Sequence, residues 1–422
     1  MARRRRDRHD RPGHRIVPRL LRGGGLRDSR LTVEVHSLGC RLNISESETL
    51  RGLLRGAEDL VVVNSCAVTA EAVRQTRQAI RRARKERPDA RLIVTGCAAE
   101  VERAMLAAMP EVDGLVPNTA KLDPRAWNVP VAPAPIERRA YTRGFVQVQN
   151  GCDHACTFCV IPQGRGSSRS RSMAEVLHDV AVHLDAGVNE VVLTGVDLTS
   201  WGGDLDGAPR LGTLCEAILA QFPALPRLRL SSIDGAEVDE ALFELLAGEA
   251  RVMPHVHLSL QHGHDLILKR MKRRHSRADA VRLVTDLRAR RPEIAIGADL
   301  IAGFPTEDEE AHAANLSILG ELQVVHGHVF PYSQRPGTPA ARMPQVDAAT
   351  IKARAAELRA RIAEIRADWL TGLIGQPLSV LAERGAKGHA ENFAAVRLPP
   401  DAQPGTLIRV TPARVVEGIL ES

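Results

Sequence analysis

The chain has 422 residues, of which 44% are hydrophobic and only 3% aromatic, so it is long enough for two or three domains with mainly aliphatic cores. No apolar run approaches the length of a membrane span, and none follows the N-terminal arginines as in a secretory signal, so no membrane partner is expected. Seven cysteines, an odd number, argue against a disulfide framework and for a reducing, cytoplasmic location where clustered cysteines bind metal or carry out chemistry.

Positive charge is concentrated at the N-terminus. Residues 1–30 contain eleven arginines and three aspartates, a local excess of +8 in a chain whose net charge is +6, so the remainder is slightly negative. We interpret residues 1–30 as a disordered basic arm, which is either an inert tail or a contact for RNA. Any nucleic-acid site on the rest of the chain must then be a local basic patch.

Residues 31–116 repeat one pattern three times: a β-branched apolar run ends, a cysteine follows, and a helical pattern begins. The runs at 31–37, 59–65 and 91–96 precede Cys40, Cys66 and Cys97. This alternation predicts an N-terminal α/β domain with a parallel sheet, whose carboxyl edge would carry all three thiols. We expect them to share an iron–sulfur cluster with one open iron for an exogenous sulfur. The alternative is three unrelated buried thiols, which is how we interpret Cys215.

The composition changes after this domain. Residues 117–141 contain five prolines and are predicted to be a linker. Over 142–346, about six strand–helix units predict a partial parallel α/β barrel, short of the eight that would close it, with active residues in the loops after the strands. The strand candidates are 144–150, 190–195, 227–232, 255–260, 294–304 and 324–332.

Two further elements complete the predicted α/β fold. A connecting amphipathic helix is expected over 347–373, where Ala355, Leu358 and Ile362 belong to one apolar stripe. Residues 374–422 hold short β-prone runs broken by glycine and proline, which predicts a small antiparallel β-barrel.

The strongest chemical signal is Cys152, Cys156 and Cys159, spaced C-x3-C-x2-C in a loop after the first barrel strand. Three thiolates this close can ligate three irons of a 4Fe-4S cluster. The fourth iron would stay open to S-adenosylmethionine (SAM), whose one-electron cleavage gives a 5′-deoxyadenosyl radical. The alternatives are an electron-transfer cluster and a zinc site, although zinc usually takes four ligands and no fourth is adjacent.

Together these motifs resemble the radical SAM methylthiotransferase family, over essentially all of residues 31–422. The matching stretches include Gly39-Cys40-Arg41-Leu42-Asn43, Asn64-Ser65-Cys66, Thr95-Gly96-Cys97, Gly164-Arg165-Gly166, Gly303-Phe304-Pro305 and His328-Val329-Phe330-Pro331-Tyr332. The tail is similar to the family's RNA-binding TRAM barrel, although it is short. Arg41-Leu42 beside the first cysteine is similar to the branch acting on N6-threonylcarbamoyladenosine next to the anticodon of tRNA. His262 and His264 depart from the usual serines.

The resemblance also implies cofactors and partners: two 4Fe-4S clusters, SAM, a tRNA substrate, a reducing electron donor and a sulfur donor. One SAM would methylate the sulfur and another would give the radical that activates carbon 2 of adenine. We expect a monomer. The alternatives are methylthiolation of isopentenyladenosine or of a ribosomal protein, and a non-catalytic iron–sulfur sensor that binds tRNA.

Several other residues are expected near the cofactor or the RNA. By resemblance, Phe158 would pack beside the adenine of SAM, and the loop Gly195-Val196-Asp197 would bind its amino group; the alternatives are loop packing and a helix N-cap. Ser232 and Gln261, at strand ends, are weaker SAM candidates. Two basic clusters would suit RNA phosphates, the second being alternatively a solvated helix face. They comprise Arg165, Arg169 and Arg171, and Lys269, Arg270 and Lys272 with Arg273 and Arg274.

Overall fold

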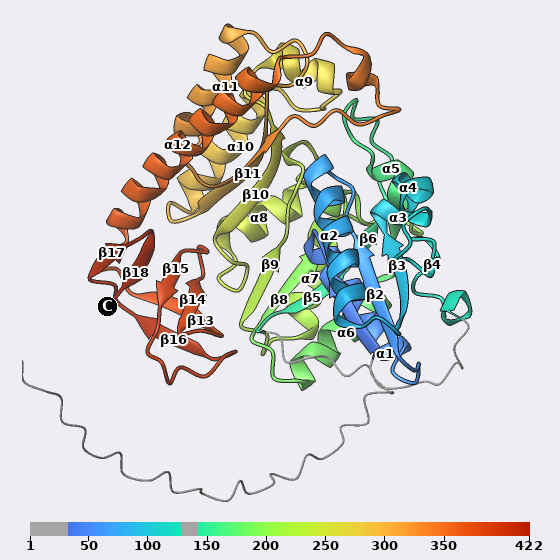
Figure 1. Ribbon diagram of the computed structural model, residues 1–422. Helices are drawn as coiled ribbons and strands as arrows, with labels where there is room; N and C mark the ends of the chain where they lie inside the picture. Colours follow the sequence, from blue (N-terminus) through green and yellow to red (C-terminus); the bar gives the residue numbers. More distant parts are fainter. Residues whose placement is uncertain (1–32, 128–141) are drawn as a thin grey trace, which may run out of the picture.

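The computed structural model describes residues 33–127 and 142–422 (Figure 1). The predicted basic arm, residues 1–30, lies outside the described residues. In the described part no helix is both long and apolar enough to cross a membrane. Three sheet-containing parts follow one another along the chain and meet around a central hollow.

The N-terminal part is a parallel four-stranded sheet in the order β1-β2-β3-β4. The central strand β2 is buried along its whole length, as expected for a parallel strand covered on both faces. Thr69 caps α2 by accepting a hydrogen bond from the backbone N–H of Ala72 at 3.1 Å. The elements are β1 (Val33–Ser37), α1 (Arg41–Leu53), β2 (Leu60–Ser65), α2 (Ala70–Glu86), β3 (Arg91–Gly96), α3 (Cys97–Val101), α4 (Arg103–Ala107) and β4 (Gly114–Leu115).

The expected linker 117–141 needs a correction at its start. Residues 117–127 pack on the N-terminal sheet instead of leaving it. Trp127 is buried in the same apolar cluster as Val35 and Val62, and its indole N–H donates to the carbonyl of Lys121 at 2.7 Å. The linker prediction rested on prolines, and prolines do not distinguish a segment that packs on a sheet from one that leaves it. Residues 128–141 lie outside the described part.

The middle part contains the six predicted strands, paired in parallel as β5-β8-β9 and β10-β11-β12. Single parallel bridges, Leu228 with Val252 and Ile233 with Leu258, join the two groups into one open barrel wall. The strands are β5 (Gly144–Gln147), β8 (Glu190–Thr194), β9 (Arg227–Leu230), β10 (His255–Gln261), β11 (Ala295–Ala302) and β12 (Val324–Pro331), with a small antiparallel pair β6 (Gln149–Asn150) and β7 (Arg169–Ser170) beside them.

Helices cover the outer face of this wall (Figure 1). Strand residues such as Val256 and Leu258 point into the shared apolar core, whereas the alternate residues His255 and His257 line the opposite, inner face. The helices are α5 (Ile161–Arg165), α6 (Met173–Asp185), α7 (Leu211–Gln221), α8 (Glu240–Gly248), α9 (Asp265–Met271), α10 (Arg277–Arg290) and α11 (Glu309–Glu321).

The long helix α12 (Ala348–Gly372) packs along β12 and leads to the C-terminal sheet. Its buried residues include Ala355, Leu358, Ile362 and Ile365, which are those of the predicted stripe. The C-terminal sheet has the order β16-β13-β14-β15-β18-β17 and is antiparallel except between β15 and β18. Its strands are β13 (Leu378–Glu383), β14 (Lys387–Ala390), β15 (Ala395–Arg397), β16 (Leu407–Val410), β17 (Arg414–Val416) and β18 (Ile419–Glu421).

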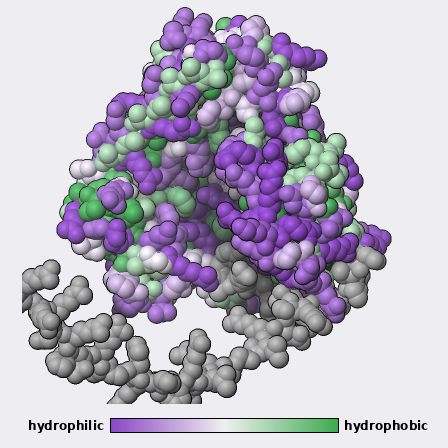
Figure 2. All heavy atoms as spheres, viewed as in Figure 1, coloured by the Kyte–Doolittle hydropathy of each residue, from purple (hydrophilic) through white to green (hydrophobic). Residues whose placement is uncertain are grey.

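The three parts enclose a polar hollow. Figure 2 shows the molecule hollowed between the C-terminal sheet and the N-terminal part, with hydrophilic residues in the hollow. The carboxyl ends of the N-terminal strands and the inner face of the barrel wall both contribute to this region, so their loops are positioned to form one site.

Candidate active site

The first cysteine triad lies at the carboxyl edge of the N-terminal sheet, as its sequence pattern predicted. Cys40 stands at the N-cap of α1, Cys66 follows β2, and Cys97 begins α3 directly after β3. Gly39 has φ +90°, and a Cβ there would lie 2.8 Å from the Cys66 sulfur, so only glycine lets this loop approach the thiol. Burial raises the pKa of Cys66 to about 11, and the neighbouring Cys40 and Cys97 thiols contribute to this rise.

A buried network of ion pairs and hydrogen bonds connects the loops of this triad. The Glu46 carboxylate lies 2.5 Å from Lys121 Nζ and 2.9 Å from Arg165 Nη1, and all three side chains are almost completely buried. Arg165 Nη2 also donates to Asn43 Oδ1 at 2.6 Å, while Asn43 Nδ2 donates to the carbonyl of Ser65 at 3.0 Å. Burial by itself would raise the pKa of Glu46, but Lys121 and Arg165 outweigh it and lower that pKa. The network therefore fixes the loops that carry the cysteines.

The second triad lies in the loop after β6, against α9. Thr157 fastens this loop, because its Oγ1 donates to the carbonyl of Arg270 at 2.8 Å and its N–H donates to the carbonyl of Met271 at 3.1 Å. Arg273 Nη1 donates to the Cys156 sulfur at 3.6 Å, while its Nη2 is paired with Asp234 at 2.9 Å. Arg273 therefore ties the Cys156 side chain to Asp234 on the barrel wall.

The segment that follows the second triad packs against Cys97 of the first triad. A Cβ at Gly164, which follows the second triad, would lie only 3.2 Å from the Cys97 Cβ. Asn118 Nδ2 bridges the same place by donating to the Gly164 carbonyl at 2.6 Å and to the Cys97 sulfur at 3.9 Å. Burial raises the pKa of Cys159 to about 11, with smaller contributions from Cys156 and Cys97. Sulfurs of both triads therefore belong to one electrostatic site.

The donor set fits iron–sulfur clusters better than single metal ions. Within residues 33–127 and 142–422, neither triad brings all three sulfurs within 4.8 Å of one another. A single zinc ion with bonds of about 2.3 Å to sulfur would need them closer, whereas a cluster spreads its thiolates over separate irons. Each triad supplies three thiols from free cysteines, which leaves one iron of a four-iron cluster without a cysteine.

The residues expected around SAM gather near the second triad. Asp197 Oδ2 lies 2.5 Å from His154 Nε2 and 3.8 Å from the Cys152 sulfur. Asp197 does occupy the N-cap position of the short 3-10 helix Leu198–Ser200, as the alternative expected, but its side chain makes no cap hydrogen bond there. A Cβ at Gly195 would lie 3.0 Å from Gln149 Oε1, which accepts the backbone N–H of Val196 and that of Asp197. The glycine keeps this turn tight beside the cysteine loop.

The other three expected SAM residues lie on neighbouring loops. Phe158 packs edge-on against Phe304, with ring centroids 6.2 Å apart. Ser232 Oγ is 3.2 Å from Ser259 Oγ across the strand ends, and Gln261 has φ +67° at the end of β10. None of these contacts tests whether the three residues touch SAM, so their roles in SAM binding stay predictions.

The two basic clusters do not behave alike. Arg165 is only 2% exposed and paired with Glu46, so our expectation that it contacts RNA phosphate is corrected: its partner on α1 lies far away in the sequence. Arg169 is exposed, whereas Arg171 pairs with Asp179 at 2.6 Å. In the second cluster Lys269 and Lys272 are exposed; Arg270 is half-buried and bonded to Thr306, Arg273 turns toward Cys156, and Arg274 pairs with Glu237.

Sequence reasoning missed three residues of the site and assigned a fourth to another role. Glu46 offered a signal, because it shares a helix face with Leu42 and a carboxylate on a buried face needs a partner. Lys121 and His154 offered none, since their partners come from other parts of the fold. Arg273, which was assigned to the second basic cluster, instead contacts Cys156. His262, one of the two histidines that stand in place of the family's usual serines, is buried and hydrogen-bonded to Glu307 at 3.1 Å.

Comparisons with known proteins agree with this division. The profile of the Radical SAM superfamily matches residues 146–316, and that of the Uncharacterized protein family UPF0004 matches residues 32–117. Each match contains one cysteine triad. A solved structure with the same fold is the radical S-adenosylmethionine methyltransferase TsrM from Kitasatospora setae, with a TM-score of 0.53 and 18% identity, covering 74% of this chain and 77% of that one.

Curated relatives extend over nearly the whole chain. The threonylcarbamoyladenosine tRNA methylthiotransferase MtaB of Rickettsia prowazekii (strain Madrid E) is 42% identical, over 93% of this chain and 97% of that protein. The tRNA-2-methylthio-N(6)-dimethylallyladenosine synthase of Cereibacter sphaeroides (strain ATCC 17025 / ATH 2.4.3) is 32% identical, over 89% and 94%.

Proposed function

Because this chain belongs to the family of radical SAM tRNA methylthiotransferases, we propose that it transfers a methylthio group to carbon 2 of N6-threonylcarbamoyladenosine in tRNA, adjacent to the anticodon. The observation that carries the chemistry is the packing of Gly164 and Asn118 on Cys97, which brings the radical-forming triad and the auxiliary triad to one site. The relative at 42% identity supports the choice of nucleoside. A substrate adenine would lie between the two triads, flipped out of the anticodon loop.

We assign Cys152, Cys156 and Cys159 as ligands of the SAM-binding cluster, and Cys40, Cys66 and Cys97 as ligands of the auxiliary cluster. When bound to its reduced cluster, SAM supplies a 5′-deoxyadenosyl radical that removes the hydrogen from carbon 2 of the adenine. The chain's own contribution is to orient and enclose the reactants. The Glu46 network holds the auxiliary loops, while Asp197 offers a carboxylate oxygen to a cationic amino group beside Cys152.

The same proposal assigns the surrounding residues. Phe158, Gly195, Ser232 and Gln261 would contact SAM from the loops around the second triad. The exposed Arg169, Lys269 and Lys272 are suitable for RNA phosphates, and Arg270 lies beside them. The C-terminal sheet is our candidate for a TRAM-like RNA-binding domain, with boundaries near 374–422.

Further partners follow from the reaction. Cleavage of SAM takes one electron, and the transferred sulfur is not the sulfur of SAM, so the enzyme requires a reducing electron donor and a sulfur donor. Both triads belong to one chain, which is consistent with a functional monomer. A tRNA substrate is consistent with a cytoplasmic location.

A reconstitution assay tests the function. Anaerobically reconstituted protein, given dithionite, SAM, sulfide and tRNA bearing N6-threonylcarbamoyladenosine, should produce the 2-methylthio nucleoside. Cys156→Ala should abolish SAM cleavage, whereas Cys66→Ala should preserve cleavage and lose the methylthio product. Cys215→Ala is the matched control, because this thiol is buried in the barrel core away from both triads. Loss of cleavage in a Cys66→Ala protein that retains the SAM-binding cluster would contradict the division of roles.

A further inference from the structure

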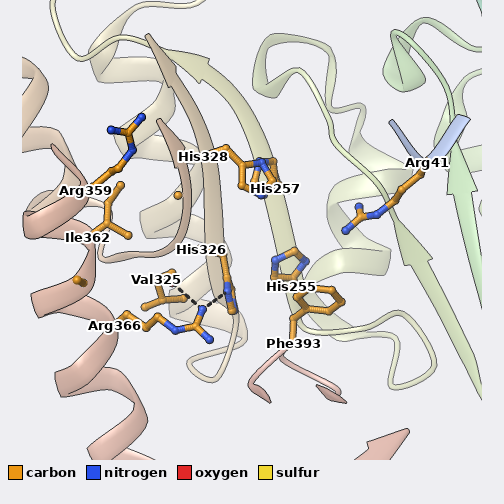
Figure 3. A pocket seen from close by; sticks show the side chains of 12 residues that line it. Arg41, His255, His257, Val325, His326, His328, Arg359, Ile362, Arg366 and Phe393 are labelled. Carbon is orange, nitrogen blue, oxygen red and sulfur yellow. Dashed lines mark hydrogen bonds between the residues drawn. The ribbon is translucent and has the colours of Figure 1, made fainter. Parts of the chain in front are cut away.

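A pocket of about 340 Å³ opens on the inner face of the barrel wall, between α12, the C-terminal sheet and the start of α1 (Figure 3). Its lining contains three arginines and four histidines but no aspartate or glutamate. Figure 3 shows Arg41 reaching from the N-terminal part toward His255, with Arg359 and Arg366 on α12 at the opposite side. Two separate parts of the fold, the start of α1 and α12, thus direct guanidinium groups at one space.

Among the described residues, none of these three arginines forms a direct ion pair with an aspartate or glutamate, although the charges of Glu190 and Asp299 act on Arg41 from farther away. Arg41 Nη1 has a weak hydrogen bond to the carbonyl of Ser231 at 3.4 Å, Arg359 donates to the carbonyl of Val329 at 2.9 Å, and Arg366 to the His326 ring at 2.9 Å. Arg41 and Arg366 are half-buried and Arg359 is exposed, so the cost of leaving a charge unpaired falls mainly on the first two.

The arginines nearest to Arg41 already have acidic partners. Arg143 lies 2.6 Å and Arg229 2.8 Å from the Glu190 carboxylate. The guanidinium carbons of all three arginines lie near the Phe393 ring. Their distances from its centroid are 5.6 Å for Arg143, 5.0 Å for Arg229 and 5.9 Å for Arg41. Arg41 is therefore the member of this group that has no direct ion-pair partner among the described residues.

Aromatic rings form the floor of the pocket, and the ring nitrogens of one of them have no hydrogen-bond partner among the described residues. His255 is buried, and neither of its ring nitrogens has a hydrogen-bond partner in the described part of the protein. Its ring lies 5.1 Å from that of Phe393 and 5.2 Å from that of His326. Burial lowers the pKa of His255 well below its usual value, so the neutral ring offers one N–H donor and one acceptor.

The position of the pocket connects it to the reaction site. Arg41 directly follows Cys40, and Ser231, whose carbonyl it contacts, precedes Ser232 at the end of β9. Halfway along the inner face, Asp299 Oδ1 is 3.0 Å from both His257 and His328, so this carboxylate is occupied by its own partners. A nucleoside held between the triads would extend its N6 substituent along this face.

We propose that this pocket binds the free carboxylate of the N6 substituent of the substrate nucleoside, with Arg41 as its main ion-pair partner. The inference rests on the proposed function and adds a residue that determines specificity. The half-buried guanidinium of Arg41 can form two parallel hydrogen bonds with a carboxylate, and His255 can donate a third. An RNA backbone phosphate fits less well, because phosphate contacts normally come from exposed side chains, whereas Arg41 is half-buried and lies beside the buried His255 and the Phe393 ring.

The test uses two anticodon stem–loop RNAs and the reconstituted full-length protein. One RNA carries N6-threonylcarbamoyladenosine, and the other carries the same nucleoside with its carboxylate converted to a neutral amide. Charge-assisted hydrogen bonds of this kind correspond to roughly 10- to 100-fold in affinity, so the wild-type protein should bind the acid at least about tenfold more tightly. Arg41→Gln should remove the preference without weakening binding of the amide.

Two variants on α12 complete the design. Arg366→Gln should reduce the preference for the acid RNA over the amide RNA. Because Arg366 lies outside the cysteine loops, this variant still tests the carboxylate pocket if the Arg41→Gln protein fails to hold iron. Arg361→Gln is the matched control, since this arginine is exposed and pairs with Glu364. Iron content is measured for every variant.

Each outcome has one meaning. A wild-type protein that methylthiolates the acid RNA but binds both RNAs equally would overturn the carboxylate pocket and leave the function intact. Equal weakening of both RNAs by Arg41→Gln would assign this arginine to a phosphate and also overturn the inference. Turnover of an isopentenyladenosine stem–loop in place of the acid RNA would refute the proposed function itself, a result obtained from the wild-type protein alone.

Discussion

Replacing Glu46 by glutamine removes one buried negative charge and leaves Lys121 and Arg165 facing an amide. Lys121 can respond by losing its proton, and burial already lowers its pKa. Arg165 cannot be deprotonated in a protein, so it stays charged and uncompensated. Breaking one partner out of a buried ion pair costs about 3–5 kcal/mol, and we expect the free energy of unfolding to fall by that amount.

The assay is equilibrium unfolding in urea at pH 7, followed by circular dichroism on the cluster-free, reduced chain. Glu71→Gln is the matched control, because Glu71 forms an exposed pair with Arg74 and its loss should change little. Adding Arg165→Met to Glu46→Gln should recover part of the loss, since an apolar side chain leaves no buried charge. Equal unfolding free energies for Glu46→Gln and Glu71→Gln would refute the reasoning.

The remaining predictions concern pH and metal. Lys121 and Arg165 hold the pKa of Glu46 below its ordinary value of 4.5 despite burial, so its stabilisation is present above pH 4.5 and is lost as the pH falls through the lower folded-state pKa. The difference in unfolding free energy between wild-type protein and Glu46→Gln should therefore shrink below pH 4.5; a constant difference down to pH 2 would contradict this. Anaerobically reconstituted protein should contain roughly eight irons per chain, and Cys215→Ala should retain them, whereas a stable value near four irons, or stoichiometric zinc, would exclude two clusters.

Much of the fold was predictable because local patterns determine it. The runs that became β1, β2 and β3 are strongly apolar and β-branched, and each is followed by a cysteine at the edge where parallel strands end. The six barrel strands and the stripe of α12 were visible for the same reason. The carboxyl-edge position of both triads then follows from topology.

What the sequence did not reveal depends on contacts between distant residues. Arg165 looked like part of a basic surface cluster because its neighbours are arginines and serines, yet its partners Asn43 and Glu46 lie about 120 positions earlier. Lys121 stood in a proline-containing stretch and was assigned to a linker. His255 belongs to an ordinary strand pattern, and only the assembled barrel, α12 and the C-terminal sheet make it the floor of a pocket.

The central claim is tested most directly by nucleoside mass spectrometry of tRNA from cells that lack the gene. The 2-methylthio form of N6-threonylcarbamoyladenosine should vanish, while its unthiolated precursor accumulates, and expression of the wild-type chain but not of Cys156→Ala should restore it. Persistence of that nucleoside together with loss of the 2-methylthio isopentenyl form would contradict the assigned substrate. If both nucleosides were unchanged and a ribosomal protein lost the mass of a methylthio group, RNA would not be the target.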